Sequence, residues 1–157
     1  MEYGGKLLYK GEKYPIEKAC GKAAFTGDVF LIPPDSDGYP DNHLAEKLLR
    51  KLAARDLTRK TIETARIMDV VPVSVKITGA RTRWGSCSAA RGINYSWRLI
   101  MADEKSIEYV IIHELAHIIE FNHSEKFWNV VKSYCPDYIA RRAHLKAIQA
   151  EIESYKL

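Results

Sequence analysis

The stretch "EYVIIHELAHIIEFNHSEKFW", residues 108–128, places three histidines in a run of mainly apolar residues. Polar side chains are costly to bury unless a partner satisfies them. Residues 113–117 read His-Glu-Leu-Ala-His, so on a helix His113 and His117 lie one turn apart on the same face, about 6 Å from each other. The spacing therefore predicts a helix whose two histidines hold a metal ion.

The glutamate between the histidines indicates hydrolysis. Two imidazoles can share one ion at about 2.0–2.1 Å from each nitrogen. Glu114 stands one residue round the helix, where it can reach a water at the ion's open position without being a ligand. This arrangement is typical of metal-assisted hydrolysis, with Glu114 as the general base. Since the flanking residues are apolar almost all round, we expect the helix to be buried.

A catalytic site of this kind needs a third protein ligand, and we predict His123. It follows His117 by six residues, so the helix has to end before it. We expect that end at Asn122, because asparagine tolerates the left-handed conformation. Ser124 then caps the next helix.

Other residues compete for the third position. Glu120 lies one turn after His117 on the same face, and a carboxylate from the C-terminal segment, Glu151 or Glu153, is a further alternative. His43 and His144 lie on basic amphipathic helices, so we expect them at the surface.

Composition predicts a single domain over residues 1–157, with 46% hydrophobic and 28% charged residues. No apolar run approaches the ~18 residues of a membrane span, and the N-terminus lacks the apolar core of a signal peptide. Three isolated cysteines indicate a reducing compartment rather than a disulfide framework. We therefore expect a cytoplasmic protein without a membrane partner. The net charge of +4 permits an acidic partner but requires none.

The residue patterns predict an α+β fold, in which a small antiparallel sheet packs against helices. The expected elements are a hairpin over 6–19, a strand over 28–33, a helix over 42–68, strands over 73–78 and 93–101, the histidine helix from Asp103 or Ser106, and helices over 124–134 and from Asp137. The segment 93–101 is read as a strand because its residues alternate between apolar and polar as far as Leu99.

Four segments together resemble a known family: "TRWGSCS" (82–88), "INYSWRLI" (93–100), "IEYVIIHELAHIIEFNHSEKFWNVV" (107–131) and "CPDY" (135–138). They are similar to the YgjP-like metallopeptidases, which are themselves similar to SprT-like and WLM-type zinc proteases. The resemblance is strongest over residues 81–145. It implies a zincin-like catalytic domain with one zinc ion per chain on His113, His117 and His123, and Glu114 as the general base.

The segment "RTRWGSCS", residues 81–88, allows a structural and a functional interpretation. Trp84 suits the core and Gly85 a bulge. Alternatively, the segment binds substrate: a peptide adds to it as a strand, and Arg81 or Arg83 stabilises negative charge on a substrate oxygen. Cys87 has no adjacent base in the sequence, so we do not predict a nucleophile.

Two tyrosines are candidate donors to a substrate oxygen, Tyr138 and Tyr95. We count Arg83, Trp84 and Tyr138 as candidate substrate-binding residues.

The predicted function is a zinc metallopeptidase that acts on a peptide or protein. One alternative keeps the metal and hydrolyses a different bond, such as a nucleotide phosphoanhydride, with Arg83 holding phosphate. Another is a DNA-associated protease of the SprT-like kind, which would bind DNA in a salt-dependent manner. The least favoured alternative is a non-catalytic module with structural zinc, because a structural site does not need a base such as Glu114 beside the ion.

Overall fold

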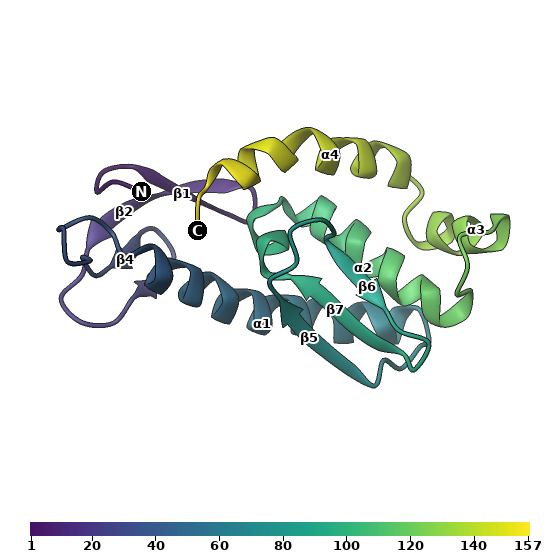
Figure 1. Cartoon of the computed structure of the whole chain (residues 1–157). Coiled ribbons are helices and arrows are strands. Elements are labelled where there is room, and N and C mark those ends of the chain that lie inside the picture. The colour runs from purple at the N-terminus through teal and green to yellow at the C-terminus, as the bar shows by residue number, and fades with distance from the viewer.

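Two small sheets and four α-helices make up the protein in the computed structural model, which describes residues 1–157. Figure 1 shows the long helix α1 running along one side of the molecule and α4 along the other, with α2 between them. The elements are β1 (Lys6–Tyr9), β2 (Glu12–Lys18), β3 (Ala24–Phe25), β4 (Phe30–Ile32), α1 (Asn42–Ile67), β5 (Ser74–Thr78), β6 (Gly85–Cys87), β7 (Gly92–Ser96), the 3-10 helix η1 (Trp97–Met101), α2 (Glu104–Ile119), α3 (Glu125–Tyr134) and α4 (Tyr138–Ser154).

The N-terminal sheet has the strand order β1-β2-β4-β3, and its first hairpin confirms the predicted one. The hairpin turns at Lys10 and Gly11, which both have positive φ angles, of 50° and 80°. A side chain at Gly11 would lie 2.9 Å from the β-carbon of Asp103, so only glycine allows this close approach. The hairpin is thereby fixed against the residue that begins α2.

The second sheet has the order β5-β7-β6, in which β7 pairs parallel with β5 and antiparallel with β6. In the first sheet β2 and β4 also pair in parallel. The predicted α+β class is confirmed, but the sheets are mixed rather than antiparallel throughout. Sequence periodicity identifies a strand without revealing its neighbour, because side-chain alternation is the same in both kinds of pairing.

The strand predicted over residues 93–101 ends at Ser96, so the prediction is wrong for residues 97–101. The hydroxyl of Ser96 accepts a hydrogen bond from the backbone N–H of Arg98, and residues 97–101 turn into η1. All five residues of η1 are buried. Apolar residues here therefore reflect burial on every side, and not the alternating faces of a strand.

The histidine helix α2 is central to the core. Asp103 caps it, as one of the two predicted caps, and its carboxylate accepts from the N–H of Ser106 at 3.0 Å. Nine of its sixteen residues are buried, and large side chains of the core include Trp97, Tyr95 and Phe127. None of the helices combines the length and the apolar character that a membrane span requires.

A buried carboxylate ties the N-terminal hairpin to α1. Asp56 is only 5% exposed; it accepts hydrogen bonds from the hydroxyl of Tyr9 and, at 2.7 Å, from Nε of Arg55, and it lies 3.3 Å from Nζ of Lys10. Burial alone favours the protonated acid, but the hydrogen bonds from Arg55 and Tyr9 and the charge of Lys10 lower the pKa of Asp56 to about 2. The contacts therefore stabilise the ionised form.

Replacing Asp56 with asparagine is expected to lower the free energy of unfolding by about 2 kcal/mol at pH 7, because charge-assisted hydrogen bonds are lost. The pKa of Asp56 is lower in the folded state than the value of about 3.9 for an unfolded chain. The contribution of Asp56 to the free energy of unfolding is therefore complete above the unfolded-state pKa and disappears as the pH falls towards 2. Urea unfolding at several pH values measures this, with exposed Asp28→Asn as the control. A difference between wild type and Asp56→Asn that persists at pH 2 would contradict the assignment.

Candidate metal centre

Helix α2 and the loop after it bring the three histidines together. The helix ends at Ile119, where Glu120 takes an extended conformation (φ −133°, ψ 106°). The prediction that Asn122 ends the helix is wrong, because the backbone leaves the helical path at Glu120, and Asn122 is not left-handed. The consequence is the same: the chain turns back, and His123 reaches the face that carries His113 and His117.

One ligand atom from each imidazole lies within 4.8 Å of the others. The Nε2 atoms of His113 and His123 are 3.2 Å apart. Two nitrogens that share one tetrahedral zinc ion at about 2.05 Å are about 3.3 Å apart. The group contains no fourth Cys, His or carboxylate. Three imidazoles with an open fourth position are the donor set of catalytic zinc sites, whereas structural sites have four protein ligands. The residues present therefore fit a catalytic metal ion.

Neighbouring groups orient two of the rings. The backbone carbonyl of Phe121 lies 2.7 Å from Nδ1 of His117; since a carbonyl only accepts, Nδ1 carries the proton and Nε2 has a free lone pair. The hydroxyl of Tyr109 lies 3.4 Å from Nδ1 of His113. Partners of this kind fix the ring and the tautomer of metal-binding histidines.

Aromatic rings enclose the cluster on the side of α3. Ser124 caps α3, accepting from the N–H of Phe127, as predicted. The ring of Phe127 stacks on His117 with centroids 4.4 Å apart, and Trp128 stacks on His123 at 5.9 Å. These rings pack against the imidazoles and hold them in place.

Two of the three histidines, His113 and His117, have a lowered pKa in this environment. Burial, followed by the neighbouring His117 and His123, lowers the pKa of His113 to about 3. Burial likewise lowers the pKa of His117. Neutral imidazoles are the form that binds metals.

Glu114 is buried beside the cluster, with 5% of its surface exposed. Burial raises the pKa of its carboxyl group to about 7, against the opposing charge of Arg83, and no hydrogen bond contributes to the shift. A buried carboxylate without a partner in the protein is costly. Its position is explained if a water molecule on the metal ion is its partner.

Gly85 allows β6 to lie directly against this carboxylate. A β-carbon at Gly85 would be 3.0 Å from Cγ of Glu114 and 3.1 Å from the backbone oxygen of Asn94. The predicted bulge at Gly85 is wrong, because the residue pairs regularly with Tyr95 within β6. Glycine is required here by close packing rather than by a distorted backbone.

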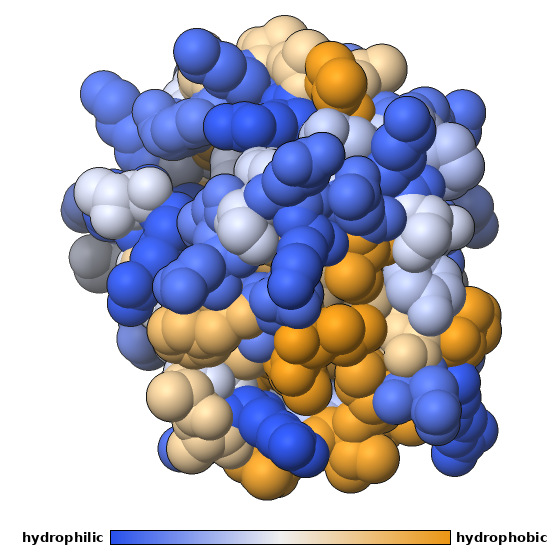
Figure 2. Space-filling model, turned by 90° about the vertical axis from the view of Figure 1, so that its right-hand side faces the viewer, coloured by the Kyte–Doolittle hydropathy of each residue, from blue (hydrophilic) through white to orange (hydrophobic).

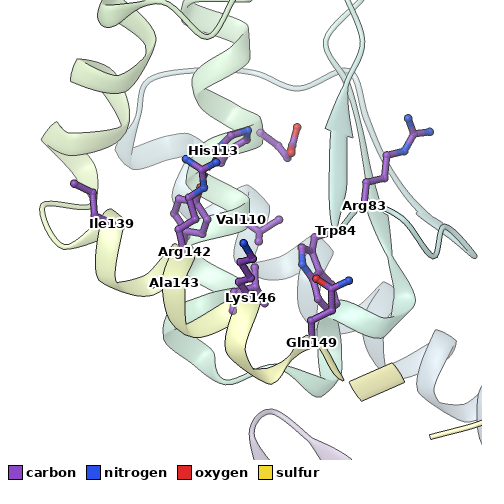
Figure 3. A pocket seen from close by; sticks show the side chains of 12 residues that line it. Arg83, Trp84, Val110, His113, Ile139, Arg142, Ala143, Lys146 and Gln149 are labelled. Carbon is purple, nitrogen blue, oxygen red and sulfur yellow. Dashed lines mark hydrogen bonds between the residues drawn. The ribbon is translucent and has the colours of Figure 1, made fainter. Parts of the chain in front are cut away.

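Two cavities meet at Glu114 and His113. One, of about 580 Å³, extends between α4 and the segment Arg83–Trp84 (Figure 3). The other, of about 440 Å³, is lined by β6, the three histidines, Phe121 and Asn122. A space of this size beside a buried carboxylate suits a bound substrate.

Apolar side chains are exposed where α2 ends, and one of them, Phe121, lines the second cavity. Figure 2 shows hydrophobic side chains gathered over the lower part of the face on the side of α3, below a mainly hydrophilic region. At the end of α2, Ile119 is 44% and Phe121 54% exposed. Exposed apolar residues at a cavity are typical of surfaces that bind another molecule.

The sequence model of the YgjP-like metallopeptidase domain matches residues 1–148. The chain belongs to the YgjP-like metallopeptidase family. It is therefore a metallopeptidase, an enzyme that uses a metal ion to hydrolyse peptide bonds, and the resemblance inferred from the four sequence segments is confirmed.

Two crystal structures of metallopeptidase zymogens are similar in fold to this YgjP-like chain. One is jannalysin of Methanocaldococcus jannaschii (24% identity, TM-score 0.51), and the other is abylysin of Pyrococcus abyssi (20% identity, TM-score 0.52). Each alignment covers 60% of this chain, with 96% of the jannalysin chain and 93% of the abylysin chain. At these identities the likeness shows a shared fold. Among curated proteins, none matches the chain.

The competing metal ligands lie outside the histidine group. Glu120, Glu151 and Glu153 do not join it, and Glu151 instead pairs with Lys13 at 2.6 Å. His43 and His144 are exposed, as predicted, and His144 lies 3.0 Å from Asp103.

The candidate substrate-binding residues have different positions. Arg83 and Trp84 line the cavity next to Glu114, whereas Tyr138 stacks on Trp128 at 5.3 Å and lines neither cavity. The prediction that Tyr95 donates a hydrogen bond to the substrate is wrong, because Tyr95 is fully buried and its hydroxyl accepts a hydrogen bond from Thr61. Cys87 lines the second cavity, and burial raises the pKa of its thiol, which makes it a poor nucleophile.

Three residues at the site were not predicted from the sequence: Tyr109 behind His113, and Arg142 and Lys146 across the larger cavity. The spacing of Tyr109 and His113, four residues apart on a helix, was an available signal. Arg142 and Lys146 lie in a basic run that resembles an ordinary solvated helix face. Only the packing of α4 reveals that this face borders a cavity.

Proposed function

We propose that this metallopeptidase uses one zinc ion per chain, held by His113, His117 and His123, and that residues 1–157 form one catalytic domain. The observation that carries the proposal is the convergence of three imidazole nitrogens beside the buried, unpartnered carboxylate of Glu114. Three imidazoles suit zinc among the divalent metals.

The zinc ion, when bound, would polarise the carbonyl of the scissile bond and lower the pKa of a water molecule towards 7. Glu114 accepts a proton from the attacking water at a carboxylate oxygen. It then donates that proton to the nitrogen of the leaving amine. His117, held by the carbonyl of Phe121, keeps its Nε2 directed to the site without reorganisation during the reaction.

The edge of the second sheet would align the peptide. β6 is an edge strand that pairs only with β7, and Gly85 brings it against Glu114. A peptide that adds to β6 as a further strand would place its backbone beside the carboxylate. Arg83 lines both cavities next to Glu114, so it is suited to stabilise negative charge on the carbonyl oxygen during attack.

Removing the metal is expected to abolish peptide hydrolysis, and adding zinc at one ion per chain to restore it. The protein is treated with a chelator, and the activity against a peptide library is measured during titration with zinc. Calcium, which prefers oxygen ligands, is the control and should restore nothing. Activity that survives complete removal of the metal, or saturation at two ions per chain, would contradict the proposal.

The positive charges around the larger cavity also suit a second reaction, the hydrolysis of a nucleotide phosphoanhydride. Arg83, Arg142 and Lys146 surround the cavity at Glu114, and cations also suit a nucleotide phosphoanhydride. The same preparation assayed with a nucleotide panel separates the two reactions. Association with DNA remains a prediction, which is tested by measuring how binding to DNA depends on the salt concentration.

A further inference from the structure

The larger cavity has two unlike walls. Figure 3 shows α4 on one side, with Ile139, Arg142, Lys146 and Gln149, and Trp84 on the other. The cavity has a volume of about 580 Å³ and reaches His113 and Glu114 at one end. Its apolar lining includes Val110, Ala143 and Leu145. This volume falls within the usual range of small-molecule and peptide-residue sites.

One face of α4 supplies the polar groups of this wall. Ile139, Arg142, Lys146 and Gln149 follow each other at spacings of three, four and three residues, so they lie along one stripe of the helix. The stripe presents a guanidinium, an ammonium and an amide to a cavity whose other polar lining residues, Arg83, His113 and Glu114, lie at its catalytic end.

The two cations on this stripe have no acidic partner in the protein. Arg142 and Lys146 take part in none of the ion pairs within the chain. The adjacent Arg141 differs, because it lies 2.9 Å from Asp137 and 3.3 Å from Glu108. The only acidic residue that lines the cavity is Glu114. Arg83, which also lines the cavity and forms no ion pair, lies next to Glu114 and is assigned to the carbonyl oxygen of the scissile bond. Arg142 and Lys146 are therefore the two positive charges on α4 that are available to an anion from outside.

Arg142 is held at the end of the cavity next to the histidines. Its guanidinium lies 5.4 Å above the ring of Trp128, which in turn stacks on His123. Figure 3 shows its head group beside His113. Arg142 is exposed, and its contact with Trp128 reduces the freedom that its side chain loses when it binds a ligand.

We propose that Arg142 and Lys146 bind a carboxylate of the substrate in this cavity, so that the enzyme selects peptides with a carboxylate close to the scissile bond. The assignment rests on the proposed function, because the cavity opens onto Glu114. The carboxylate belongs either to an Asp or Glu side chain or to the C-terminus of the substrate. The apolar stem of the residue packs against Trp84 and Ile139, and Gln149 offers an amide donor.

A carboxylate suits this cavity better than a phosphate. The chain is a metallopeptidase by family, so its substrates carry carboxylates. Phosphate sites commonly add several backbone N–H groups from a helix N-terminus or a glycine-rich loop. Here the polar groups are side chains in the middle of α4, between apolar residues.

Peptide binding to the Glu114→Gln variant loaded with zinc tests the assignment without turnover. The probes are fluorescein-labelled, alanine-rich decapeptides with one glutamate at each internal position in turn, and the same set with glutamine. Both sets are prepared with a free or an amidated C-terminus. One carboxylate peptide is expected to bind about tenfold more tightly than its neutral counterpart, because a charge-assisted hydrogen bond is gained. Preference for glutamate identifies a side chain, and preference for the free acid identifies the C-terminus.

Variants assign the preference to the two cations. The double variant Arg142→Gln, Lys146→Gln should lose the preference for carboxylate peptides. The control is the double variant Lys51→Gln, Arg66→Gln, which removes the same charge from exposed positions on α1 and should keep the preference. Lys146→Glu should favour peptides that carry lysine instead. Equal affinity for neutral and acidic peptides, or a stronger preference for pyrophosphate than for any carboxylate peptide, would overturn the assignment.

Turnover is measured separately with the wild-type enzyme and zinc. Carboxylate-dependent binding without hydrolysis of any peptide would contradict the proposed mechanism and keep the assignment of the cavity. Hydrolysis without a carboxylate preference would support the proposed mechanism and contradict the assignment of the cavity.

Discussion

Glu114→Gln is expected to reduce kcat for peptide hydrolysis by about 10³-fold or more, consistent with the loss of a general base that also acts as an acid. Glutamine has nearly the same shape but neither accepts the water proton nor returns it to the amine. Because the glutamate is proposed as a base and not as a ligand, the variant should bind zinc as the wild type does. Steady-state kinetics and elemental analysis of the purified variant measure the two effects.

The matched control is Glu120→Gln, which makes the same chemical change at the end of α2, outside the histidine group. It should leave kcat and metal content unchanged. A Glu114→Gln variant that retains full activity would remove Glu114 from the mechanism. A variant that loses the ion would show that Glu114 is itself a ligand.

His123→Ala is expected to weaken zinc binding by more than about 100-fold, the upper end of what is lost when only a supporting partner of a ligand is removed. Two imidazoles on α2 would remain, and they provide too few ligands for a stable tetrahedral site. Competition with a chromophoric chelator measures the affinity. Circular dichroism should show an intact fold, because His123 is exposed and lies in a loop.

His43→Ala is the control for this variant, since His43 is exposed on α1 and far in sequence from the cluster. It should keep the wild-type affinity. If His123→Ala retains the ion while Glu120→Ala loses it, the third ligand is the rival carboxylate, and the proposed coordination is wrong.

The larger features of the fold were predictable because they depend on neighbours in sequence. Asp41, Asp103 and Ser124 cap helices with their own side chains, and each cap bonds to an N–H two or three residues ahead. The first hairpin turns at Lys10 and Gly11, as the sequence indicates. Two of the predictions that were wrong involve tertiary contacts: the parallel pairing of β5 with β7, and the burial that turns residues 97–101 into η1.

The sequence by itself determined that His113, Glu114 and His117 share a helix at one-turn spacing, because the α-helix has a fixed period. It also predicted that the chain turns back at His123, although the turn begins at Glu120. The tertiary structure decided which residues from distant segments border that helix. Gly85 and Arg142 reach it from β6 and α4, and such contacts depend on how whole elements pack, which no local pattern specifies.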